Sequence, residues 1–432
     1  MRAENREFHH ETMYDFAFKS GMSVPPVCPD NSGCQGYRWL GGCLCLAILI
    51  CFVHSALAQQ QNPDTAKVQQ KDLLDLLGKY VKLRKRQATP GHGIFFSFLP
   101  VSGATTNGNS FVVSSVNATF KLGSPETKLS SIYFIPYTNL STRFGFIIRP
   151  NIWLSDNNWN MNGEFRIIHN DVETYRLGSG SSDENGDLVS NDQLKIFLNA
   201  NKRIVGNFYL GWGYNLDYFY DIDEHWSGPG ESEFKKYGFG VGANSTTSGF
   251  GPNFVFDSRT NVNNPINGLY SSLSFRLNPV FMGSSYNWSS IYFDNRKYIP
   301  LSDHWHSVLA FWLVYWGTYG EVPYFDLPAT ASDISEKLGR GYQRWRFRGN
   351  QLLYSEAEYR FDISANGFWG GVVFANVQSF TEPVTNNFAY LRPAIGTGLR
   401  IKFNRKSNVN MALDFAIGRD SFDWHLSLGE YF

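Results

Sequence analysis

Residues 408–418 read NVNMALDFAIG, and this stretch decides the fold. Apolar side chains stand at every second position from Val409 to Ile417, and polar or small residues mostly occupy the positions between them. Successive side chains of a β-strand point to opposite faces, so the stretch predicts a strand with one apolar and one polar face. The end of the chain, residues 422–432, repeats the alternation and places Phe432 on the predicted apolar face.

The same alternation begins at residue 91 and continues to the end of the chain. A soluble two-sheet sandwich would also alternate. Here, however, the polar face carries charges throughout, and no cysteine occurs after residue 51 to form disulfides. These features favour an all-β fold, a transmembrane antiparallel β-barrel whose polar face lines a wet lumen. A spanning strand takes about 9–11 residues, so residues 91–432 predict a barrel of about sixteen strands.

The first 58 residues have the features of a secretory signal peptide. An apolar run, residues 44–53, follows Arg38 and leads to Ala56-Leu57-Ala58. A basic flank, a short apolar core and an Ala-x-Ala end predict cleavage after Ala58. All five cysteines lie before that point, so no thiol chemistry is expected in the mature chain. Residues 59–90 are polar and predict a periplasmic tail, for which a short helix and plain disorder both fit.

Composition and motifs argue against several classes of function. Lys+Arg and Asp+Glu are equal at 38 each, so no overall positive field attracts nucleic acid. No nucleophile lies in a recognisable catalytic pattern, so neither an enzyme nor a cofactor is expected. His304 and His306 have a spacing that can bind metal, but a position at the membrane interface is favoured because no third ligand is near, and no metal is predicted. Residues 238–242, GFGVG, imitate a dinucleotide motif but predict a strand.

The longest connection in the C-terminal half lies between predicted strands that end near Tyr319 and begin near Leu352. Its second half, residues 339–350, reads GRGYQRWRFRGN and holds four arginines. In the next strand, Glu356, Glu358 and Arg360 fall on the predicted lumen face. Guanidinium groups bind carboxylates through a two-pronged fork. The pattern therefore predicts a loop that folds back into the barrel and is held there by ion pairs.

These residues resemble the bacterial surface antigen family, whose relatives include the BamA and TamA assembly barrels. Four stretches carry the resemblance: the loop motif Gly339, Arg340, Gly341 and Tyr342 with residues 346–350 and the strand at 358–361, the mid-barrel motif Asp257, Arg259, Pro265 and Gly268, the segment 396–400, and the C-terminal segment 414–432. The resemblance is strong over residues 236–432 and weak over 91–235. It implies a sixteen-stranded barrel in the outer membrane of a Gram-negative bacterium.

The resemblance also implies roles for particular residues. Arg340 would be held by Glu358 and by a second lumen-wall position where the family often has Asp and this chain has Asn376. Arg360 would lie beside them on the lumen wall, and Phe432 would be the C-terminal signal of the barrel. Residues 59–90 are too few to form the POTRA module that family members with insertase activity usually carry.

The function implied by the resemblance is assembly, insertion or export of outer-membrane proteins. In this family, insertion is attributed to a weakly paired seam between the first and last strands, with the inward loop bracing the barrel. The expected partners are outer-membrane lipid and unfolded barrel clients or other envelope proteins. A passive channel and an accessory barrel that scaffolds a surface complex are the alternatives. The channel would need an unobstructed lumen.

Overall fold

The structure is a computed structural model, and it describes residues 72–73, 95–104, 113–124, 127–138, 144–182, 186–262, 264–301, 307–404 and 408–432. The predicted signal peptide and almost all of the predicted tail lie outside these residues. Within them, no helix is long and apolar enough to cross a membrane.

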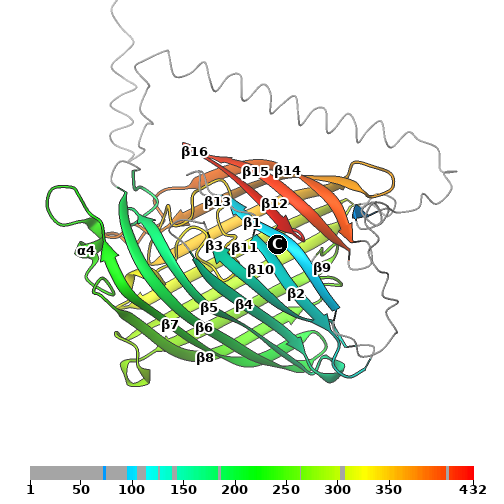
Figure 1. Cartoon of the computed structure of the whole chain (residues 1–432), viewed down its shortest axis with the longest axis horizontal. Coiled ribbons are helices and arrows are strands. Elements are labelled where there is room, and N and C mark those ends of the chain that lie inside the picture. The colour runs from blue at the N-terminus through cyan, green and yellow to red at the C-terminus, as the bar shows by residue number, and fades with distance from the viewer. Residues whose placement is uncertain are drawn as a thin grey trace, which may run out of the picture. The chain divides into compact units, whose positions relative to one another are not determined.

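Sixteen antiparallel strands form the described fold, and each pairs with its neighbours in chain order (Figure 1). Their bounds are β1 Phe95–Ala104, β2 Val113–Phe120, β3 Ser130–Thr138, β4 Phe144–Trp153, β5 Trp159–Thr174, β6 Asp187–Val205, β7 Phe208–Glu224, β8 Ser245–Asp257, β9 Gly268–Asn278, β10 Trp288–Pro300, β11 Val308–Gly320, β12 Gln351–Asp362, β13 Trp369–Phe380, β14 Arg392–Asn404, β15 Val409–Gly418 and β16 Ser421–Leu428. Strand β1 also pairs with β16, so the sheet closes into a barrel. The predicted barrel of about sixteen strands is confirmed.

The two faces of each strand separate as the alternation predicts. On β15, Phe415 and Ile417 are 41% and 47% exposed, whereas Asp414 and Ala416, on either side of Phe415, are each 1% exposed. Large apolar side chains are exposed in the same way around the barrel, including Leu198, Trp212, Leu277, Phe311, Leu353, Ile395 and Phe422. An apolar surface of this extent is typical of a membrane-facing wall. The polar positions therefore face the lumen.

Strands β5, β6 and β7 are longer than the rest, with 16, 19 and 17 residues. They exceed the about 9–11 residues that a spanning strand needs, so they continue past the apolar band. The short helix α4 (Glu233–Tyr237) follows β7 and ends at Gly238, whose φ of 89° is left-handed. The prediction of a strand at 238–242 is therefore wrong, because α4 and two left-handed glycines, Gly238 and Gly240, make this segment a turn before β8.

The barrel interior contains buried apolar clusters as well as polar residues. One cluster joins the connection between β11 and β12 to the lumen wall, with Leu338, Tyr342 and Phe347 packed against Trp312 and Tyr354. A second joins the first half of the same connection to α4 and the long strands, through Tyr324, Leu327, Phe234 and Val189. The connection is thus anchored inside the barrel along its whole length.

Candidate functional site in the lumen and at the strand seam

The connection between β11 and β12, residues 321–350, is called the inward loop here. Its two motif glycines have left-handed backbones, with φ of 90° at Gly339 and 95° at Gly341. Both also lie against the wall: a Cβ at Gly339 would lie 2.6 Å from Gln378 Oε1, and one at Gly341 would lie 2.7 Å from Ala394 Cβ. Only glycine combines this backbone with such close approach. The glycines therefore bring Arg340 against the lumen wall.

The Arg340 side chain is fully buried between three carboxylates and two rings. It donates to Glu356 and Glu358 on β12, and to Asp414 on β15 at 2.9 Å. Its guanidinium carbon lies 3.5 Å from the centre of the Phe374 ring and 3.8 Å from that of Tyr431. Charge-assisted hydrogen bonds and ring faces both favour a cation in this position.

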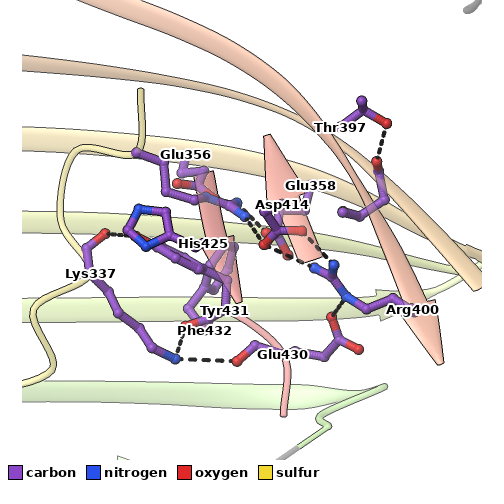
Figure 2. Close-up of polar contacts among 12 residues, drawn as sticks. Lys337, Glu356, Glu358, Thr397, Arg400, Asp414, His425, Glu430, Tyr431 and Phe432 are labelled. Atoms are coloured by element: carbon purple, nitrogen blue, oxygen red, sulfur yellow. Dashed lines mark hydrogen bonds and ion pairs between the residues drawn. The ribbon is translucent and has the colours of Figure 1, made fainter. Parts of the chain in front are cut away.

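Two further arginines extend this cluster along the wall. Arg360 Nε donates to Glu358 at 2.7 Å, and Arg400 Nε donates to Glu430 at 2.7 Å while its Nη1 donates to Asp414. Figure 2 shows Arg400 between Asp414 and Glu430. We call Arg340, Arg360, Arg400, Glu356, Glu358, Asp414 and Glu430 the lumen ion network. Every carboxylate in the network has at least one arginine partner, and these ion pairs offset the desolvation cost of burying the charges.

The remaining arginines of the loop fix other parts of it. Arg344 donates to Glu336 within the loop at 2.9 Å. Arg346 donates to the hydroxyl and carbonyl oxygens of Ser181 at 2.9 and 2.8 Å, and Arg348 donates to the Tyr324 carbonyl at 2.7 Å. Each arginine of the loop therefore binds a group inside the protein and helps to hold the loop in place.

The C-terminal residues also turn into the lumen. Gly429 has a φ of 85°, and after it Glu430, Tyr431 and Phe432 are all buried. The Phe432 ring lies 5.1 Å from that of Trp312, and its carbonyl accepts from Arg360 Nη2 at 2.9 Å. The expectation that Phe432 lies on the lipid face is wrong, because the left-handed Gly429 interrupts the alternation of β16. Lys337 of the inward loop donates to the Tyr431 carbonyl at 2.6 Å (Figure 2).

This inward turn shortens the seam that closes the barrel. Strands β1 and β16 pair only through Ser102 with Leu426, Gly103 with His425 and Ala104 with Trp424. Continuing the register would place Leu99 opposite Gly429 and Phe96 opposite Phe432. Since residues 429–432 lie in the lumen instead, the first half of β1 pairs with β2 but has no β16 partner among the described residues.

Solved structures of other proteins share this fold. BamA from Haemophilus ducreyi lacking POTRA domains 1–3 matches with a TM-score of 0.51 and 14% identity, over 88% of this chain and 78% of that chain. The chain has the fold of a BamA-like outer-membrane β-barrel. CdiB from Acinetobacter baumannii (TM-score 0.48, 10% identity, 77% of this chain and 59% of that chain) and CdiB from Escherichia coli (0.49, 9%, 78% and 63%) also match. No family model and no curated protein matches the sequence.

Of the residues predicted to hold Arg340, Glu358 binds its side chain and Asn376 binds its backbone in this BamA-like barrel. Glu358 receives the guanidinium, and Arg360 lies on the far side of that carboxylate. Asn376 lies beside the loop, but its Nδ2 donates to the backbone carbonyl of Arg340 at 3.0 Å rather than to its side chain. Sequence reasoning did not assign Glu356 or Asp414 as partners of Arg340. Both occupy lumen-facing positions in strands whose side chains alternate between apolar and polar, and this alternation is the sequence signal that places them in the lumen.

The mid-barrel motif forms a separate cluster at the turn between β8 and β9. Asp257 accepts from Arg259 Nε at 2.9 Å and from Nη2 at 3.1 Å, and the guanidinium carbon lies 4.3 Å from the Tyr270 ring centre. Gly268 opens β9 with a φ of 102°, close to the Ser258 carbonyl, and Pro265 is buried in the turn. The motif does not contact the lumen ion network through any described residue. His304 and His306 lie outside the described residues, so their interface position stays a prediction.

Proposed function

We propose that this BamA-like barrel aids the assembly, insertion or export of other outer-membrane proteins by offering the free edge of β1 to a client strand. The observation that carries the proposal is the seam of three residue pairs between β1 and β16. By comparison, β1 pairs with β2 through seven residue pairs and β15 pairs with β16 through eight.

The physical basis is the cost of unpaired backbone groups in lipid. Each unsatisfied amide or carbonyl costs several kcal/mol in the hydrocarbon region. Residues 95–101 of β1 have one edge paired with β2, and their other edge has no strand partner in the described part of the chain. An extended segment can add to such an edge through main-chain hydrogen bonds, whatever its side chains. A client strand would satisfy groups that the barrel's own last strand leaves unpaired.

The inward loop and the C-terminal residues support this role from inside. Lys337 and Arg340 belong to the loop, and both contact the C-terminal segment, through the Tyr431 carbonyl and the Tyr431 ring. The loop therefore holds the C-terminal residues away from β1 and keeps the edge open. The same occupation of the lumen argues against an unobstructed passive channel. An accessory barrel would share the fold but would need no available edge.

The test is reconstitution of the purified chain in liposomes with an unfolded outer-membrane barrel protein as client. We expect faster folding and insertion of the client, measured by protease protection and gel mobility, than in empty liposomes. Ion conductance is recorded on the same preparation. Steady conductance without faster insertion would make the protein a channel. The absence of both insertion and conductance would favour an accessory barrel.

A further inference from the structure

A cavity of about 370 Å³ lies inside the barrel between β5–β11 and the inward loop. Small-molecule sites typically enclose about 300–1,000 Å³, so the cavity is of ligand size. No member of the lumen ion network lines it. It is therefore a separate feature that the proposed function does not use.

The wall formed by β5–β8 is unusually rich in side-chain amides, and neighbouring amides are linked. Asn253 Nδ2 donates to Asn199 Oδ1 at 2.7 Å, and Asn199 Nδ2 donates to Asn162 Oδ1 at 3.0 Å. Each amide has both donors and an acceptor but no net charge. The wall is thus a fixed, neutral array of donors and acceptors.

Two glycines on β7 make room for this array. A Cβ at Gly211 would lie 2.3 Å from Asn201 Oδ1, and one at Gly213 would lie 2.4 Å from Asn199 Oδ1. Any larger side chain there would displace the amides. The backbone of β7 is therefore fitted to the amide array.

Several amide atoms at the cavity have hydrogen-bonding capacity to spare. Asn191 is 1% exposed, and neither its oxygen nor its nitrogen has a hydrogen-bond partner among the described residues. The Oδ1 atoms of Asn215 and Asn253 are likewise buried without a partner in the described part of the chain. Buried polar groups are nearly always satisfied, so such a group calls for an explanation. A ligand carrying both donors and acceptors would supply these hydrogen bonds.

Aromatic rings line the cavity beside the amides. Trp288 and Tyr292 lie on β10 and Trp316 on β11, and all three are partly exposed. The Tyr292 and Trp316 ring centres are 5.7 Å apart in an edge-to-face arrangement. Ring faces carry partial negative charge, so they attract the weakly positive C–H groups of an apolar ligand face.

The charged residues that line the cavity nearly balance in sign, with five basic and four acidic side chains. Arg276 and Asp326 hydrogen-bond to the neutral side chains of Asn199 and Thr247, and other charged residues form ion pairs. Lys195 pairs with Asp217 at 3.1 Å, and Arg296 pairs with Asp294 at 2.6 Å. Paired charges of this kind give little attraction for an ion. The site therefore favours an uncharged ligand.

We propose that this cavity binds a short neutral saccharide. Sugar hydroxyls both donate and accept, which matches the amides, and the C–H face of a sugar ring matches the aromatic side chains. The proposal is independent of client insertion, since it uses none of the seam or network residues.

The experiment uses the full chain in detergent and three neutral trisaccharides as probes, built of glucose, mannose or N-acetylglucosamine. Binding is measured by calorimetry and by saturation-transfer NMR. We expect at least one trisaccharide to bind, and we expect at least tenfold weaker binding in Asn191→Leu and in Trp316→Ala. The matched controls are Asn295→Ala and Trp212→Ala, which remove an amide and an indole from positions outside the cavity lining. Trp316→Phe keeps a ring and should retain part of the affinity. Heat-dependent gel mobility checks that every variant is folded.

Two results would overturn the proposal. One is that no trisaccharide binds the wild-type chain, or that folded cavity variants bind as tightly as the controls. The other is that an extended Gly-Ser-Asn peptide binds and loses affinity in the cavity variants while the sugars do not bind, which would make the cavity a polypeptide site. Either result leaves the insertion assay unaffected.

Discussion

Replacing Arg340 with alanine should destabilise the folded barrel by about 3–5 kcal/mol, the usual loss when one partner is removed from a buried ion pair. The loss should not be shared evenly among its three carboxylates. Glu358 would keep Arg360 at 2.6 Å, and Asp414 would keep Arg400. Glu356 would keep only the Tyr354 hydroxyl among the described residues. Glu356 is therefore the carboxylate that Arg340→Ala leaves buried without a cation.

This asymmetry gives the prediction a sharp internal test. Adding Glu356→Gln to Arg340→Ala removes the stranded charge and should recover part of the lost free energy, whereas adding Glu358→Gln should recover less and leave Arg360 short of a partner. Unfolding is followed by tryptophan fluorescence in urea with the barrel in lipid vesicles, and the exposed Arg419→Ala is the control, expected within about 0.5 kcal/mol of wild type. The reasoning is refuted if Arg340→Ala unfolds like Arg419→Ala, or if the two rescues are equal.

Three further predictions can be tested by the same urea unfolding measurement, repeated across a pH range for the first of them. Burial alone would raise the pKa of Glu430, but its arginine neighbours outweigh burial and lower that pKa from 4.5 to about 2. The ionised Glu430 carboxylate therefore stabilises the fold fully above about pH 4.5, and this stabilisation is lost as the pH falls towards 2. Glu430→Gln should flatten the plot of unfolding free energy against pH in that range, and an unchanged slope would contradict this. Gly341→Ala should lower the free energy of unfolding by about 1–3 kcal/mol. The loss should exceed that of Gly230→Ala, because Gly230 has a positive φ of 76° but open space around it. Equal losses would show that the close approach of Gly341 to Ala394 has no energetic effect. Arg259→Ala should cost roughly 3 kcal/mol, because the buried Asp257 would keep only the more distant Lys128, at 4.0 Å. A loss under about 0.5 kcal/mol would show that the turn does not need the Asp257–Arg259 pair.

The strands and their faces could be predicted because they depend on local alternation. The lumen-facing positions of β12 and the inward course of the loop follow from Glu358, Arg360 and the arginine run alone. Alternation gives the face of a residue but not its height in the barrel. The meeting of Arg340 with Asp414 on β15 depends on the register of several intervening strands, which no local pattern encodes.

The C-terminal residues show a different limit. The pattern from Phe422 to Leu428 is regular, and nothing in it indicates that the chain turns after Leu428. The turn depends on the positive φ of Gly429 and on the arginines that receive Glu430. Long-range charge pairing overrides the apolar preference of Phe432 for lipid. The saccharide cavity likewise requires the register, since its asparagines come from separate strands and look like ordinary lumen residues in the sequence.

The most direct test of the central claim is to lock the seam. Gly103→Cys and His425→Cys stand directly opposite each other on β1 and β16, and Ala412→Cys with Ser427→Cys gives a matched control pair on β15 and β16. The five natural cysteines, all at or before residue 51, are changed to serine in both variants. A client strand that runs along the whole of β1 must displace the three β16 pairs at Ser102–Ala104, and the disulfide forbids this. We therefore predict that the oxidised seam pair abolishes accelerated client insertion in liposomes and that reduction restores it, while the control pair works in both states. Undiminished insertion with a fully oxidised seam would contradict the account.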